Sequence, residues 1–174
     1  MNRYQTLERR LGALIVDLIV VAAPIAVLDI FLRSLDLSAL LLIPWLLIAT
    51  FAGAVYHILL QGWYGQTLGK MLLGIIVVRN DDEGPISVYE AFLREIPTMV
   101  FNALAFASRT HALLSGGSLD LSASQPTDSL LMFLTLPWVL AEVISALKTR
   151  KRRAVHDFIA GTVVVRTDLI ERAG

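Results

Sequence analysis

Four long apolar stretches set the pattern of hydrophobic and polar positions along the chain. They cover residues 11–32, 39–60, 96–114 and 129–147. A helix of about 20 apolar residues, with a range of roughly 17–25, crosses the hydrocarbon core of a bilayer. The pattern therefore predicts four transmembrane helices packed in one bundle. The predicted fold class is an all-α polytopic membrane protein.

Lysine and arginine lie almost entirely on one side of these stretches. Of the 15 basic residues, 13 precede the first stretch, lie between the second and the third, or follow the fourth, and the exceptions are Arg33 and Arg109. Because loops rich in lysine and arginine stay in the cytoplasm, both termini and the segments 62–95 and 148–174 are predicted to be cytoplasmic. The first stretch exceeds the apolar core of a cleaved signal peptide and contains Asp17, so we expect it to be retained as a span.

The cytoplasmic segments carry two copies of one pattern. Residues 67–79 and 154–166 each place a short amphipathic helix before a β-branched strand, and a glycine, two valines and a final arginine coincide at an offset of 87 residues. Either two similar units converged in composition, or an ancestral two-helix unit was duplicated. An unpaired β-branched strand invites association in both cases, so residues 75–78 and 162–165 are predicted to pair in a small cytoplasmic cap.

The first short helix is predicted to lie in the membrane interface. Its apolar residues Leu68, Met71 and Leu72 are placed toward lipid, and Lys70 is placed toward water. The alignment of the two copies puts Lys70 and Asp157 at equivalent positions, which suggests a shared polar cluster.

Further basic residues are predicted to act at the cytoplasmic face. Arg10 lies at the level of the lipid headgroups, where it meets either Asp157 or a lipid phosphate, and Arg10, Lys70 and Asp157 together form a cytoplasmic gate or brace. A basic run follows the fourth span and comprises Lys148, Arg150, Lys151, Arg152 and Arg153. This run either fixes the topology alone or binds anionic lipid, at about 1 kcal/mol for each basic residue near the surface.

Each predicted span also carries one polar residue at a similar depth. These residues are Asp17, His57, Asn102 and Glu142. At about 1.5 Å per residue they lie roughly 6–9 Å below the cytoplasmic face. Because charged groups inside a membrane usually face the bundle interior, we expect the four to converge on one pocket. Two carboxylates and an imidazole suit a proton or a monovalent cation. The same groups could instead lock the helices together or bind a lipid headgroup.

Composition narrows the function classes. The chain is 56% hydrophobic and 17% charged, with a mean hydropathy of +0.67, and it has no cysteine and zero net charge. These values exclude a soluble enzyme, a nucleic-acid-binding protein and thiolate or disulfide chemistry. Residues 65–70 are one residue short of a phosphate-binding loop, and the sequence contains no catalytic motif of the common hydrolases. We therefore expect no enzyme activity, no metal centre and no cofactor.

Several motifs together resemble those of the RDD family of prokaryotic membrane proteins. They are Arg10, Asp17, the segment 65–78 and the tail 156–165, and the resemblance covers nearly the whole chain. That family is named for one arginine and two aspartates, which by motif position would be Arg10, Asp17 and Asp157. The resemblance implies a plasma membrane location in a prokaryote and a role in transport, which in some members is similar to cation/proton antiport.

The sequence therefore predicts a transporter, most concretely one that exchanges a monovalent cation for a proton. Asp17 and Glu142 would carry the proton or cation, while His57 and Asn102 would help to coordinate it. Because four helices enclose little space, we expect a transport path to require a homo-oligomer. The alternative is a non-transporting accessory or scaffold protein that binds anionic lipid or a partner membrane protein.

Overall fold

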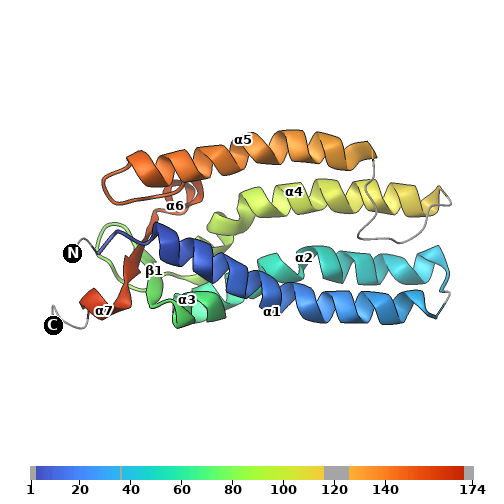
Figure 1. The fold of residues 1–174 in the computed structure, drawn as a ribbon, viewed down its shortest axis with the longest axis horizontal. Helices are drawn as coiled ribbons and strands as arrows, with labels where there is room; N and C mark the ends of the chain where they lie inside the picture. Colours follow the sequence, from blue (N-terminus) through green and yellow to red (C-terminus); the bar gives the residue numbers. More distant parts are fainter. Residues whose placement is uncertain (1–2, 36, 116–125, 171–174) are drawn as a thin grey trace.

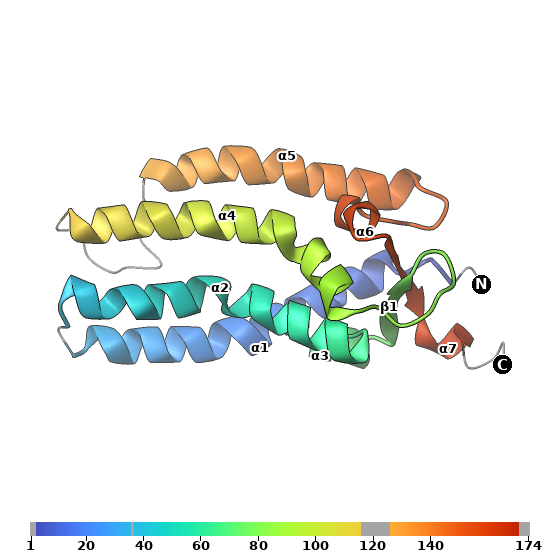
Figure 2. The ribbon, with the colours of Figure 1, turned by 180° about the vertical axis from the view of Figure 1, so that it is seen from behind.

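The computed structural model describes residues 3–35, 37–115 and 126–170 and is built on four long helices (Figure 1). These are α1 (Leu7–Arg33), α2 (Ala39–Tyr64), α4 (Val88–Leu114) and α5 (Pro126–Lys148). They run side by side along the longest axis of the molecule, and the short elements gather at the end where α1 begins and α5 ends (Figures 1 and 2). The short elements are α3 (Leu68–Leu72), β1 (Ile75–Arg79), α6 (Val155–Ile159), β2 (Thr162–Arg166) and α7 (Thr167–Ile170).

Each predicted span corresponds to one long helix. Among the described residues, two helices are long and apolar enough to cross a membrane, over Leu7–Leu32 and Leu40–Tyr64. For α4 and α5, membrane crossing stays a prediction. Large apolar side chains are nevertheless exposed on the outer surface of the bundle, with Ile30 on α1 exposed by 70% and Phe133 on α5 by 80%. A soluble protein rarely exposes such an apolar surface, so the outside of the bundle suits lipid.

The cap at one end of the bundle is built on a two-stranded antiparallel sheet. β1 pairs with β2 in the register Ile75↔Arg166 to Arg79↔Thr162, which confirms the predicted pairing. The central valines of the sheet, Val77 and Val164, are fully buried. They pack in one cluster with Ala13 of α1 and Ala91 of α4, so the sheet holds α1 and α4 together at this end of the bundle.

Backbone contacts also satisfy the second edge of β1. The amide of Val77 donates to the carbonyl of Gly65 at 2.8 Å, and the amide of Arg79 donates to the carbonyl of Gly84 at 2.9 Å. Gly65 ends α2 with φ = 68°, a left-handed conformation that a residue without Cβ adopts at no steric cost. The chain therefore turns at once from α2 into the segment that covers the sheet edge.

The order of elements repeats along the chain. Two long helices, one short helix and one strand form the first half, and the same order follows in the second half. The helix α4 opens the second half with a capping box, in which the Glu90 amide donates to the Ser87 hydroxyl and the Ser87 amide donates to the Glu90 carboxylate at 2.6 Å. It then continues through Pro97 and changes direction in its first part (Figure 2). Such a bend is typical of a helix that contains proline.

Candidate functional site

The structure divides the predicted polar layer between two environments. His57 and Asn102 line a cavity between α1, α2 and α4. Asp17 and Glu142 are not part of that lining, and each binds the first turn of a short helix in the cap. The expectation that all four side chains share one pocket is therefore wrong. Depth along separate helices does not determine the direction in which each side chain points.

The cavity has a volume of about 870 Å³ and a mixed lining. Its polar residues are Asp29, Thr50, His57, Glu95, Thr98 and Asn102. The lining of α1 extends from Leu18 to Ile30, which corresponds to about 18 Å along the helix axis. Apolar residues of α1 such as Val21 and Ile25 form much of the remaining wall. The cavity is thus an elongated, open groove between α1, α2 and α4 with ionisable groups along it.

The ionisable residues of the cavity lie at two levels. Near the cap, His57 Nδ1 lies 3.1 Å from Glu95 Oε1, and the Glu95 side chain is nearly buried. Farther from the cap, the indole nitrogen of Trp45 donates to the carboxylate of Asp29 at 3.1 Å. Each carboxylate therefore has a polar partner on α2, which lowers the cost of placing it away from water.

The sequence prediction misses Glu95 and Asp29 as cavity residues. It assigns Glu95 to the cytoplasmic segment 62–95, one residue before the predicted third span, whereas α4 carries Glu95 to the cavity. One signal was available in the sequence. Glu95, Thr98 and Asn102 have the i, i+3, i+7 spacing of side chains on one helix face.

Asp17 joins α3 to the bundle. Its Oδ1 accepts hydrogen bonds from the Tyr56 hydroxyl and the Gly69 amide, both at 2.8 Å, and its Oδ2 accepts one from the Thr67 hydroxyl at 2.6 Å. The Tyr56 oxygen in turn accepts a bond from the Leu68 amide at 3.0 Å. Free amides at the start of a helix favour a negative charge, so Asp17 fixes α3 against both α1 and α2.

Glu142 does the same for α6 in the second half of the chain. Its carboxylate accepts a bond from the His156 amide at 3.1 Å and lies 2.8 Å from the His156 ring nitrogen Nδ1. His156 is the residue of α6 that corresponds to Gly69 of α3 at the offset of 87. Both halves therefore bind a carboxylate from a long helix at the same amide of the short helix.

Asp157 is the centre of a buried ion-pair cluster. Its side chain is fully buried, Oδ2 accepts bonds from Arg10 at 2.7 Å and from the Ala154 amide at 2.9 Å, and Oδ1 pairs with Arg94. Arg94 also donates to the hydroxyl of Thr162 on β2. Burial alone would raise the pKa of Asp157, but the charges of Arg94 and Arg10 outweigh it and hold the pKa well below its usual range. The carboxylate thus stays ionised and connects α1, α4 and α6.

Comparison with known proteins identifies the family. A family model described as the RDD family matches residues 4–161. The chain belongs to the RDD family. No curated protein and no solved structure matches the chain. The RDD family is membrane-associated, and together with the apolar helices α1 and α2 this indicates a membrane location for the chain.

In this RDD protein, the arginine and two aspartates that the resemblance assigns to the family's motif make two separate sets of contacts. Arg10 and Asp157 bind each other and hold α6 to α1. Asp17 lies two turns beyond Arg10 on α1 and binds the start of α3. Together the three residues attach both short helices of the RDD cap to α1.

Lys70 differs from its predicted position in water. Its side chain is half-buried in the cap of the RDD protein. Burial lowers the pKa of Lys70 to about 7, and the charges of Arg94 and Arg10 act in the same direction, whereas Glu95 and Asp17 oppose the shift. A lysine with this pKa changes its charge near neutral pH.

Replacing Lys70 by methionine is expected to remove a pH dependence of stability. An unfolded lysine has a pKa of about 10.4, whereas Lys70 in the folded protein has a pKa of about 7. Between about pH 7 and pH 10 the unfolded protein therefore binds more protons than the folded protein. The free energy of unfolding then rises with pH over this range. Unfolding of the protein in detergent, monitored by tryptophan fluorescence at several pH values, measures how the free energy of unfolding depends on pH. Lys148→Met, at the exposed end of α5, is the control and keeps the slope. A wild-type stability that is flat over this window would contradict the prediction.

Some residues of the basic run after α5 make hydrogen bonds within the cap of the RDD protein. Lys151 donates to the Asn80 carbonyl at 2.8 Å, and Arg153 donates to the carbonyls of Asp157 and Thr162, both at 2.9 Å. Other residues of the run, Lys148 and Arg150, are exposed. Within the predicted lipid-binding group of five, the exposed members are thus the better placed to meet lipid.

Proposed function

We propose that this RDD protein binds a monovalent cation in the cavity between α1, α2 and α4 and exchanges it for a proton across the membrane. The observation that carries the proposal is the pair of His57 and Glu95 on the cavity wall, with 3.1 Å between Nδ1 and Oε1. Ionisable side chains inside a membrane are costly and mark ion and proton paths in transporters. A carboxylate beside an imidazole can accept either a proton or a cation.

Oxygen ligands on one face of α4 support a cation next to this pair. Glu95, Thr98 and Asn102 offer carboxylate, hydroxyl and amide oxygens along the cavity, and oxygen ligands suit hard cations. A cation bound at Glu95 and a proton bound at Glu95 neutralise the same charge. The two therefore exclude each other, and this competition is the physical basis of the proposed exchange.

The proposal includes a topology in the plasma membrane. The four long helices cross the bilayer, and the cap with both termini lies in the cytoplasm, which the concentration of basic residues at the cap supports. Asp17 and Glu142 then position α3 and α6 at the cytoplasmic end and do not carry the ion. Asp29, beyond His57 and away from the cap, provides a second carboxyl group along the cavity.

Replacing Glu95 by glutamine is expected to reduce cation-driven proton movement by about tenfold or more, because a contact to a charged group contributes more than the 1.4 kcal/mol that corresponds to a factor of ten. The measurement uses purified protein in liposomes with a sodium or potassium gradient and a trapped pH-sensitive dye. Asp81→Asn, which removes an exposed carboxylate in the loop before α4, is the control and retains full activity.

Two outcomes would contradict this assignment. If Glu95→Gln transports normally while a folded Asp17→Asn variant does not, the ion site lies where α1 meets α3. If the wild-type protein moves no monovalent cation at any pH tested, the exchange function is wrong and the accessory or scaffold function takes its place.

A further inference from the structure

The short helices α3 and α6 expose apolar side chains at equivalent positions. Met71 and Leu72 of α3 are exposed by 40% and 74%, and Phe158 and Ile159 of α6 by 48% and 45%. Each residue of the first pair corresponds to one of the second pair at the offset of 87 residues. Neither helix is long enough to cross a membrane, so their exposed pairs need another explanation than a membrane span.

Contacts within the protein fix the opposite sides of both helices. Asp17 holds the start of α3 and Glu142 holds the start of α6. Asp157, which precedes the exposed pair of α6, is fully buried against Arg10 and Arg94. Because these contacts prevent either helix from rotating, the apolar pairs stay on the outside.

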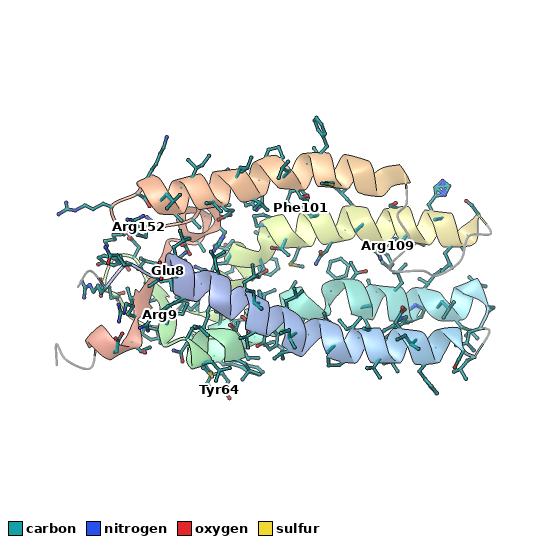
Figure 3. All side chains as sticks on the ribbon, in the orientation of Figure 1. Glu8, Arg9, Tyr64, Phe101, Arg109 and Arg152 are labelled. Carbon is teal, nitrogen blue, oxygen red and sulfur yellow. The ribbon has the colours of Figure 1, made fainter. Side chains whose placement is uncertain are left out.

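Both short helices lie beside the ends of the long helices, at a similar level along the longest axis (Figures 1 and 2). The helix α2 ends beside α3 with Trp63 and Tyr64, which are exposed by 64% and 61%. Figure 3 shows Tyr64 at the cap end of the molecule, far from Arg109 in the opposite half. Exposed tryptophan and tyrosine at the end of an apolar helix are typical of the membrane interface. The pairs on α3 and α6 thus continue the apolar surface of the bundle into the interface.

The two helices differ in the charges beside them. The guanidinium of Arg153 lies 4.0 Å from the centre of the Phe158 ring. Lys148 and Arg150 at the end of α5 are exposed, and Arg152 lies at the same end of the molecule (Figure 3). The end of α2 beside α3 presents aromatic rings instead, and Arg9 of α1, the basic residue at the end of α3, lies 3.8 Å from the carboxylate of Asp168. A basic surface next to an apolar pair matches the headgroup and acyl chains of an anionic phospholipid.

We propose that the exposed side of α6, together with Lys148 and Arg150, is a docking surface for anionic phospholipid in the cytoplasmic leaflet. Phe158 and Ile159 enter the boundary between headgroups and acyl chains, and the basic side chains meet the lipid phosphates. The equivalent pair on α3 enters the same boundary without preference for lipid charge. This inference concerns the cap and does not depend on the proposed ion exchange.

The chain contains no cysteine, so a single cysteine can report on each position. We label three single-cysteine variants with an environment-sensitive fluorophore and reconstitute each in phosphatidylcholine bilayers. The test variants are Phe158→Cys and Met71→Cys, and the control is Asp82→Cys in an exposed loop. Quenching is measured with spin-labelled phosphatidylglycerol and, separately, with spin-labelled phosphatidylcholine. We expect both lipids to quench the probes at 158 and 71 and neither to quench the probe at 82. Phosphatidylglycerol is expected to quench the probe at 158 about 25-fold more strongly, from about fivefold for each of the two basic residues. The probe at 71 is expected to be quenched equally by either lipid.

Neutralising the basic residues tests the source of the preference. In the Phe158→Cys background, Lys148→Gln and Arg150→Gln are each expected to weaken the preference for phosphatidylglycerol by about fivefold, while quenching by phosphatidylcholine remains. Equal quenching of the probe at 158 by the two lipids in the otherwise unchanged chain overturns the proposal. A probe at 158 that neither lipid quenches also overturns it, because a second copy of the chain or another protein then covers α6.

Discussion

Replacing Asp157 by asparagine is expected to destabilise the protein by about 3–5 kcal/mol, the usual cost of removing one partner from a buried ion pair. The carboxylate is fully buried and pairs with both Arg10 and Arg94. Asparagine carries no charge, so the two guanidinium groups would remain in the cap without a counter-charge. The free energy of unfolding in detergent, followed by tryptophan fluorescence, measures the loss.

An exposed ion pair provides the matched control for Asp157. Asp168 pairs with Arg166 at 2.7 Å, and its side chain is exposed by 44%. Exposed pairs contribute about 0–1 kcal/mol, so Asp168→Asn should change the stability little. A loss of less than about 1 kcal/mol for Asp157→Asn would show that the cluster does not hold the cap together.

The second large effect is expected for Gly69→Ala, with a loss of about 3 kcal/mol from overpacking and from weakened bonds to a charged group. A Cβ atom at Gly69 would lie 2.2 Å from the carbonyl oxygen of Ala13 and 2.9 Å from the carboxylate of Asp17. The backbone of α1 cannot yield by that amount, so α3 must move away and weaken its bonds to Asp17. The same unfolding measurement reports the change.

Gly53→Ala is the control for a glycine within a helix. A Cβ atom there would lie 3.9 Å from Val21, which is an ordinary contact, and alanine is favoured over glycine inside helices by about 0.5–1 kcal/mol. We expect this variant to be as stable as the wild type or slightly more stable. If Gly69→Ala behaves in the same way, α3 does not need its close approach to α1.

Regular patterns in the sequence predict much of the fold. The four apolar stretches each correspond to a long helix, and the β-branched segments pair as two strands. Both predictions depend on periodicity and residue type, which are local properties. The S-x-x-E capping box of Ser87 and Glu90 also predicts the start of α4, whereas the predicted limit of the third span at residue 96 leaves Glu95 outside the bundle.

The candidate site is less predictable than the fold. Asp17 and Glu142 are carboxylates at the depth expected for an ion site, yet they bind the backbone amides of α3 and α6. Glu95 completes the polar wall of the cavity with His57, although it lies one residue before the predicted third span. An isolated carboxylate has the same sequence signal whether it binds a helix terminus or an ion.

The sequence by itself determined that the chain consists of long apolar helices with a basic, strand-containing cap. Hydrophobicity and the helix or strand period depend only on neighbouring residues in the chain. The tertiary structure alone decided which acidic side chains face the cavity and which hold the cap. That choice depends on how α1, α2 and α4 pack and on where the amides of the short helices come to lie. These are contacts between residues far apart in the chain, and a one-dimensional pattern does not specify them.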